Sequence, residues 1–153
     1  PELFHKGLLL DPVGAKGVTF DDSMLKAFAA MKTDSALTAT VIGSTIHGVD
    51  SNAPFFRQSI VPAAQRAVET IGPWVLQALK AVDYMPLARR VQIPTLVLHG
   101  EHDVLLPMED SKALAQTMGK AEFAVLPGQG HCGNIENPKL FKTYLEKFFF
   151  NLG

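Results

Sequence analysis

Apolar residues gather in three short runs, each closed by a turn rich in glycine, proline or polar residues. The runs lie at Leu8–Leu10, Thr95–Leu98 and Glu122–Leu126, and each predicts a short buried strand. Between the last two runs, Leu114 and Met118 repeat at helical spacing and predict a helix from about Met108 to Met118. A strand, a helix and a further strand in this order fit a parallel sheet with crossover helices.

A further helix is predicted after the last strand, over residues 138–151. Asn137 precedes it as a plausible N-cap, and Pro138 suits its first position because proline lacks the N–H that a first turn leaves unpaired. The predicted helix carries an apolar stripe of the kind that packs on a sheet, made by Leu140, Phe141, Tyr144, Leu145, Phe148 and Phe149.

The long stretch between the first two strands reads as mostly helical. Thr19 or Asp21 can cap a helix over 22–32, in which apolar residues recur every three or four positions. Residues 33–53 are mixed and predict a short helix plus loop. Residues 54–86 are predicted to be helical, with prolines spaced to start helices rather than to lie inside them, namely Pro54, Pro62 and Pro73.

These elements divide the chain into a core strand and turn (1–19), a helical cap or lid (20–86) and a second core part (87–153). A sheet of three parallel strands is small, and parallel sheets need cover on both faces. The sequence also starts without Met and reaches an apolar run within a few residues. We therefore expect the chain to be part of a longer protein.

Composition excludes several classes of protein. The 153 residues are 47% hydrophobic and 19% charged, enough to bury a core, and the net charge of -1 offers neither a nucleic acid nor a membrane surface a basic patch. Apolar runs are too short for a membrane-spanning helix, and no signal peptide is recognisable. The single cysteine, Cys132, excludes an internal disulfide and favours a reducing compartment, so a cytoplasmic location is expected.

Two side chains with catalytic potential follow neighbouring predicted strands. Asp103 lies just beyond Thr95–Leu98, and His131 lies just beyond Glu122–Leu126. Ligands of open α/β sheets sit outside the carboxyl ends of the strands, where these two side chains would meet. A buried carboxylate that holds one imidazole nitrogen leaves the other basic, so Asp103 is the candidate orienter and His131 the candidate general base.

Other interpretations of the residues around Asp103 and His131 remain open. Glu101 could replace Asp103 as the acid. His99, His102 and Asp103 faintly resemble a metal cluster, but further ligands at suitable spacing are missing, so no metal is predicted. His131 on its own would be an ordinary surface histidine.

The two strand-and-turn stretches together resemble the C-terminal part of α/β-hydrolase-fold enzymes, of the lid-bearing esterase, lactonase and C–C hydrolase kind. The turn resembling G-x-x-D-x-x-x-P is Gly100 to Pro107, and the turn resembling G-x-G-H is Gly128 to His131. A downstream Glu-x-Pro is matched by Glu136 and Pro138. The resemblance implies the C-terminal part of an α/β-hydrolase fold plus a helical lid, with Asp103 as acid and His131 as histidine of a catalytic triad. Some relatives place the acid after the earlier strand, where this chain has Asp11.

The nucleophile that the resemblance implies is missing. The family carries it on a G-x-S-x-G elbow, which this sequence lacks. Ser44, in a Gly-Ser-Thr-Ile stretch, fits the pattern poorly, and Cys132 reads as a packed thiol. The implied partner is therefore the N-terminal segment of the same enzyme, and a chain without that segment is expected to be inactive.

The implied reaction is hydrolysis of an ester, lactone or related carbonyl bond of a small molecule, without a cofactor. Relatives with an aspartate nucleophile, which cleave epoxides or carbon–halogen bonds, stay open as an alternative, as does a non-catalytic module that binds a ligand or partner. The lid would line an apolar substrate pocket with Trp74, Phe55, Phe56 and Met85, while His47 and Arg57 are candidates for polar substrate contacts that no motif spacing supports.

Overall fold

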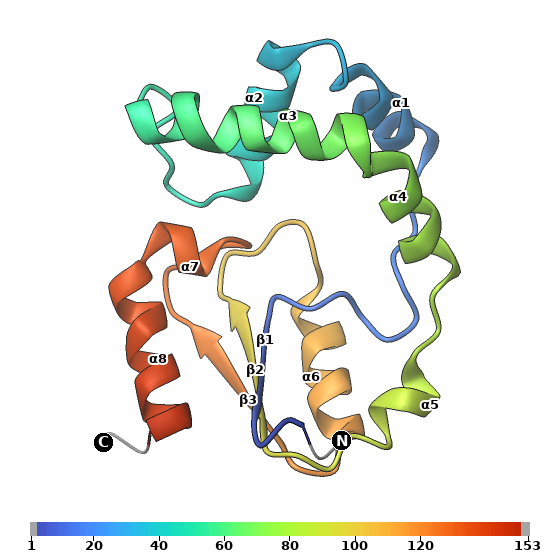
Figure 1. The fold of residues 1–153 in the computed structure, drawn as a ribbon, viewed down its shortest axis with the longest axis vertical. Helices are drawn as coiled ribbons and strands as arrows, with labels where there is room; N and C mark the ends of the chain where they lie inside the picture. Colours follow the sequence, from blue (N-terminus) through green and yellow to red (C-terminus); the bar gives the residue numbers. More distant parts are fainter. Residues whose placement is uncertain (1–2, 151–153) are drawn as a thin grey trace.

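The computed structural model describes residues 3–150 and contains one three-stranded parallel sheet (Figure 1). The strands lie side by side in the order β1 (Gly7–Leu10), β2 (Thr95–Gly100) and β3 (Ala121–Leu126). All three run in the same direction, with Leu10 opposite Leu98 and Leu98 opposite Ala124. The predicted α/β class with parallel strands is confirmed, and each strand extends one or two residues beyond its predicted apolar run.

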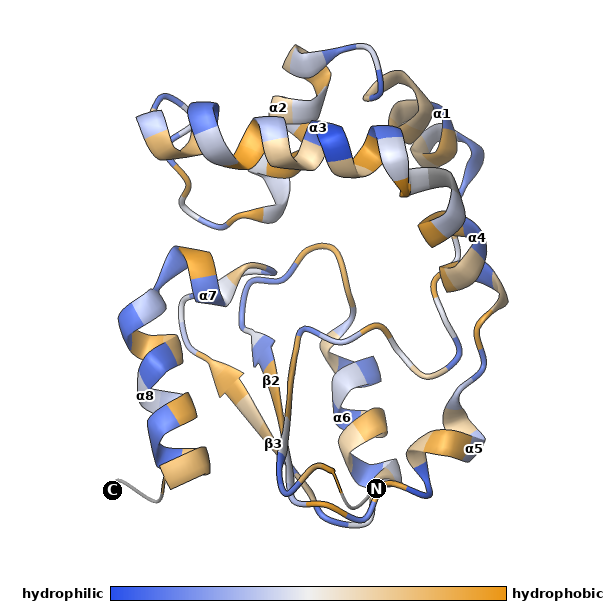
Figure 2. Cartoon of the chain, viewed as in Figure 1, coloured by the Kyte–Doolittle hydropathy of each residue, from blue (hydrophilic) through white to orange (hydrophobic). Residues whose placement is uncertain are grey.

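Helices cover both faces of the sheet, as a parallel sheet requires. On one face, α8 (Pro138–Phe150) packs against Leu96, Leu98 and Leu126 through Leu140, Phe141, Tyr144 and Phe148, four of the six residues of its predicted stripe. On the other face, α6 (Met108–Thr117) contributes Leu114 to a cluster that Leu9 of β1 joins. Apolar and polar residues alternate along both helices (Figure 2).

Local sequence signals mark where these two helices begin. Asn137 accepts the N–H of Leu140 at 3.0 Å, so the predicted N-cap of α8 is confirmed. The last residue of the predicted helix, Asn151, lies outside the described residues. A short helix that was not predicted, α7 (Gly133–Glu136), precedes α8 and follows the turn that carries His131.

The stretch between β1 and β2 is mainly helical and is called the helical insert (residues 20–86) below. Most of the insert lies beyond the carboxyl ends of the strands (Figure 1). Among residues 3–150, no helix is both long and apolar enough to cross a membrane. The insert contains α1 (Asp22–Ala30), α2 (Ser35–Thr45), a π-helical segment η1 (Phe56–Ile60), α3 (Val61–Thr70) and α4 (Gly72–Ala81), and α5 (Met85–Ala88) spans its end.

Aspartates cap the first two helices of the insert. Asp21 accepts the N–H of Met24 at 2.8 Å, which selects it over Thr19 as the cap of α1. Asp34 accepts the N–H of Leu37 at 2.9 Å at the start of α2. The short helix predicted within residues 33–53 is thus α2.

Pro54 is the first residue of a helical stretch and Pro73 is the second residue of α4, so two of the three prolines start helices as predicted. Pro62 is the second residue of α3, but the chain is helical without a break from residue 54 to residue 70. Pro62 therefore lies inside a continuous helical stretch rather than at a free helix start. The π-helical turn η1 ends two residues before it, where the backbone must accommodate a proline that cannot donate a hydrogen bond.

Candidate active site

Asp103 lies in the loop after β2, and its side chain is fully buried. One carboxylate oxygen, Oδ1, accepts the backbone N–H groups of Leu105 at 2.7 Å and Leu106 at 3.1 Å. These two bonds hold the carboxylate in one orientation, and they leave Oδ2 to accept a hydrogen bond from elsewhere.

His131 supplies that bond from the loop after β3. Its Nδ1 lies 2.9 Å from Oδ2 of Asp103, and 24% of its side chain is exposed. An ionised carboxylate can only accept, so Nδ1 carries the proton and Nε2 is the basic nitrogen. The structure thus brings together the two residues that the sequence paired.

The two loops approach closely because the pairing of β2 and β3 continues beyond the strands. The N–H of Glu101 donates to Leu126 at 3.1 Å, and the N–H of His102 donates to Gln129 at 2.7 Å. Gly100 makes this approach possible, since a Cβ at this position would lie 2.0 Å from the carbonyl oxygen of Gly130. The carboxylate of Glu101, the alternative acid, accepts the N–H of Gly128 at 2.8 Å instead of contacting the imidazole.

The contact between Asp103 and His131 shifts the pKa of each residue in the direction that favours its charged form. Burial by itself raises the pKa of Asp103, but the bonds from His131, Leu106 and Leu105 outweigh it and hold that pKa below its usual value. The hydrogen bond to Asp103 raises the pKa of His131, against the opposing effect of burial. The pair is therefore built to stabilise an imidazolium next to a carboxylate.

A third ionisable group, Asp11, lies beside this pair in the turn after β1. Its Oδ1 accepts the N–H of Gly100 at 2.7 Å, while its buried Oδ2 has no hydrogen-bond partner among the described residues. Its backbone adopts φ 42°, a left-handed conformation that is uncommon outside glycine. Burial raises the pKa of Asp11 to about 7, the bond from Gly100 lowers it, and the nearby charge of Asp103 raises it further.

The raised pKa of Asp11 predicts that the free energy of unfolding depends on pH. In the folded protein Asp11 stays neutral up to about pH 7, whereas in the unfolded chain it ionises near pH 4. The contribution of neutral Asp11 to the free energy of unfolding is therefore complete below about pH 4 and is lost as pH rises through about 7. Asn can accept the same bond and tolerates the left-handed backbone. We expect the free energy of unfolding of Asp11→Asn, relative to wild type, to rise between pH 4 and pH 7 by up to about 1.4 kcal/mol per pH unit.

Urea unfolding across this pH range measures that difference, with Asp22→Asn, a change of an exposed carboxyl, as the matched control. A difference between Asp11→Asn and wild type that stays constant with pH would contradict the raised pKa of Asp11.

The histidines near the acid do not form the metal cluster considered from the sequence. His99 is buried, its Nδ1 lies 2.9 Å from the Ser111 hydroxyl, and burial lowers its pKa, so it is a neutral core residue. The ring of His102 instead packs on that of His47, with centroids 4.5 Å apart. Among residues 3–150, the group with the spacing of a cation site is Asp11, Asp103 and His131, whose potential ligand atoms lie within 4.8 Å of one another. In this group the carboxylate of Asp103 accepts hydrogen bonds from His131 and from two backbone N–H groups, so its oxygens are engaged by the protein itself.

The two residues weighed as nucleophiles occupy unsuitable surroundings. The hydroxyl of Ser44 donates to the carbonyl of Val41 at 2.7 Å, within its own helix. Cys132 packs against the cluster of Ile46, Phe56 and Val61. Burial raises the pKa of the Cys132 thiol to about 11, and the nearby Glu136 charge adds to the shift, so the reactive thiolate is scarce at neutral pH.

The four apolar residues predicted to line a substrate pocket lie in different places. Trp74 is 73% exposed and borders a cavity of about 490 Å³ with Phe20 and Leu25. Met85, in contrast, packs against the core cluster that includes Leu114 and Met118. The structure does not bring Trp74 and Met85 into one pocket, and their role in substrate binding stays a prediction.

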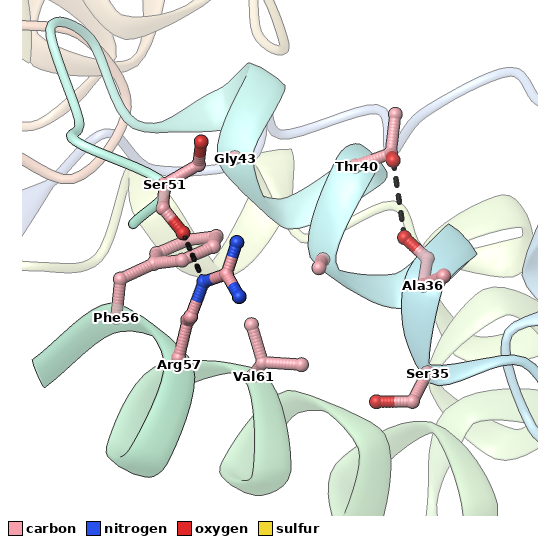
Figure 3. A pocket seen from close by; sticks show the side chains of 9 residues that line it. Ser35, Ala36, Thr40, Gly43, Ser51, Phe56, Arg57 and Val61 are labelled. Carbon is pink, nitrogen blue, oxygen red and sulfur yellow. Dashed lines mark hydrogen bonds between the residues drawn. The ribbon is translucent and has the colours of Figure 1, made fainter. Parts of the chain in front are cut away.

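The two phenylalanines lie nearer to the His131 loop. Phe55 borders a cavity of about 170 Å³ together with His47 and Glu136. Phe56 is buried and lines that cavity and a larger one of about 750 Å³ between α2 and the η1–α3 stretch (Figure 3). Arg57 projects into the larger cavity, where its Nε donates to the carbonyl of Ser51 at 2.9 Å.

Comparison with known proteins identifies a family and several enzymes that this chain resembles. The sequence profile of a family described as TAP-like protein matches residues 74–151, which is half of the chain. A putative carbamate hydrolase, RutD, of Pseudomonas savastanoi pv. phaseolicola is 33% identical over 73 residues, which cover 48% of this chain and 28% of that protein. Pyrrolizixenacetamide deacetylase of Xenorhabdus hominickii is 32% identical over 71 residues, covering 46% of this chain and 26% of that enzyme.

Solved structures agree over nearly the whole chain. The esterase RhEst1 from Rhodococcus sp. ECU1013 superposes with a TM-score of 0.69 at 24% identity, over 97% of this chain and 57% of that structure. A bromoperoxidase from Bacillus anthracis superposes with a TM-score of 0.77 at 20% identity, over 95% of this chain and 58% of that structure. The chain thus spans little more than half the length of these structures and matches about a quarter of the curated relatives. Since the family profile spans half of the chain and the fold agrees along its length, the chain belongs to the TAP-like protein family of the α/β-hydrolase superfamily.

Proposed function

We propose that this chain supplies the acid and the histidine of a serine-type α/β hydrolase that cleaves an ester, lactone or related carbonyl bond. The observation that carries the proposal is the 2.9 Å contact between Nδ1 of His131 and the buried carboxylate of Asp103. The names of the relatives, a carbamate hydrolase and a deacetylase, support a reaction at a carbonyl carbon.

In this proposal Asp103 orients and His131 moves protons. Nε2 of His131 takes the proton of a nucleophilic hydroxyl as that oxygen bonds to the carbonyl carbon of the substrate. Asp103 stabilises the resulting imidazolium, in line with the raised pKa of His131. The imidazolium then gives its proton to the departing alkoxide, and water repeats the sequence to release the acid.

The nucleophile belongs to a segment outside this sequence. Ser44 and Cys132 are held in surroundings that do not suit the role, and the chain spans little more than half of the superposed structures. The longer protein would then provide both the nucleophilic hydroxyl and the N–H groups that bind the oxyanion. Residues 20–86 would serve as the lid over the substrate.

Phenylmethanesulfonyl fluoride tests the proposal on the full-length protein, because it sulfonylates a serine only where a neighbouring base activates the hydroxyl. We expect one adduct by intact mass, loss of nitrophenyl butyrate hydrolysis in step with labelling, and neither adduct nor turnover in His131→Ala. Turnover that survives in His131→Ala would contradict the role of the histidine. An absence of both adduct and ester turnover in wild type would contradict the proposal and favour either the aspartate-nucleophile alternative or a binding module, which cleavage of an epoxide or a haloalkane would then distinguish.

A further inference from the structure

Glu136 connects three backbone N–H groups that have no role in the proposed acid–base chemistry. Its Oε2 accepts the N–H of Gly130, and its Oε1 accepts the N–H of Cys132 at 3.1 Å. These two donors are the residues immediately before and after His131. Oε1 also accepts the N–H of His47 at 2.9 Å, from a loop 89 residues away in the helical insert.

We propose that Glu136 is a positioning residue: its carboxylate fixes the backbone on both sides of His131 and ties that backbone to the helical insert at His47. The inference rests on the proposed function, in which His131 is the base. Hydrogen bonds to an ionised acceptor are about twice as strong as neutral ones, so one side chain can hold three donors from two separate segments.

The packing around Gly130 supports a built contact rather than a chance one. A Cβ on Gly130 would lie 2.8 Å from Cβ of His47 and 3.1 Å from Oε1 of Glu136. The loop and the insert therefore approach as closely as a glycine permits. Glu136 is itself fixed at the end of α7, where its N–H donates to the carbonyl of Cys132 at 2.9 Å.

The insert meets the other catalytic loop at the same place. The ring of His47 packs on that of His102, the neighbour of Asp103, with centroids 4.5 Å apart. One residue of the insert thus contacts both loops, through its N–H on the His131 side and through its ring on the Asp103 side. A displacement of the insert at His47 is transmitted to the pair through Glu136.

The experiment compares Glu136→Ala, Glu136→Gln and Glu101→Gln in the full-length protein. Gln keeps an oxygen that can accept from the loop, whereas Ala removes every acceptor, and both remove the charge. Glu101→Gln is the matched control, since Glu101 accepts one N–H of the same loop, from Gly128, without touching the neighbours of His131.

Nitrogen-15 NMR of the His131 ring provides a readout that does not depend on turnover. The imidazole has Asp11, Asp103, Glu136 and His99 as charged or titratable neighbours. We expect its pKa to fall in both Glu136 variants because a negative charge is lost, and to fall further in Glu136→Ala because the hydrogen bond to Asp103 lengthens. Glu101→Gln should leave the pKa of His131 as in wild type.

Kinetics provides the second readout. We expect kcat to drop about 10- to 100-fold in Glu136→Ala, with KM nearly unchanged. The drop in kcat should be smaller in Glu136→Gln and less than about twofold in Glu101→Gln. A Glu136→Ala protein with a lower Tm but the wild-type pKa of His131 and the wild-type pH profile would overturn the inference, as would equal effects of Glu101→Gln and Glu136→Gln. If His131→Ala keeps its turnover, the proposed function fails, and the NMR comparison still decides on Glu136.

Discussion

Asp103→Asn in the full-length protein is expected to lower kcat by about 10⁴-fold, since replacing the orienting carboxylate of a triad by an amide has an effect of this size in serine proteases. Oδ1 of Asn can keep the bonds to Leu105 and Leu106. Its NH₂ group then faces Nδ1 of His131, which must accept rather than donate. The imidazole proton moves to Nε2, and the nitrogen that should take the proton of the nucleophile is blocked.

Nitrogen-15 NMR checks the cause of this loss, because the two neutral imidazole tautomers differ in their ring nitrogen shifts. Asp11→Asn is the informative comparison, since Asp11 is the other acid that relatives suggest. We expect Asp11→Asn to retain most of its turnover. A loss of activity in Asp11→Asn together with an active Asp103→Asn would reverse the assignment of the acid.

Gly100→Ala is expected to destabilise the protein by about 1–3 kcal/mol and to lower kcat by about 100-fold. The added methyl would lie 2.0 Å from the carbonyl oxygen of Gly130 and 2.8 Å from that of Gln129. Both obstacles are backbone atoms, which cannot rotate away as a side chain can. The His131 loop must therefore move away from β2, which lengthens the contact with Asp103.

Gly7→Ala is the control for this prediction. A Cβ on Gly7 meets its nearest atom, Oγ1 of Thr95, at an ordinary 3.4 Å, so the expected change in the free energy of unfolding is within about 0.5 kcal/mol. Chemical unfolding and nitrophenyl ester turnover of both variants measure the two effects. A Gly100→Ala protein as stable and as active as Gly7→Ala would show that the two loops do not need their close approach.

The sheet and the acid–base pair were predictable because their signals are local and mutually consistent. Each strand is a short apolar run that ends at a turn, and parallel strands bring their carboxyl ends to one edge. Asp103 and His131 follow consecutive strands that pair in parallel, so the sequence order and the parallel sheet together predict that they meet. The cap at Asn137 was also predictable from local sequence, since it depends only on Asn137 and the first three residues of α8.

The connections between distant segments were not predictable. Glu136 was recognised as part of a motif, but its bond to His47 joins residues 89 positions apart and has no local signature. The burial of Asp11, which raises its pKa, likewise depends on the loops that fold over it. Residues 35–45 form a helix although small and β-branched residues dominate them, because a cap at Asp34 and packing on α3 outweigh weak propensity.

The place of the helical insert in the chain suggests how relatives can diversify. It leaves the sheet after β1 and returns before β2, whereas the bonds that orient Asp103 come from the two residues shortly after it and from His131. Exchanging this segment for one of different length would leave the strand register intact. For protein engineering, a graft at this location needs to reproduce the contacts of the insert with the core: the N–H and the ring of His47, the packing of Ile46, Phe56 and Val61 on Cys132, and the place of Met85 in the core cluster.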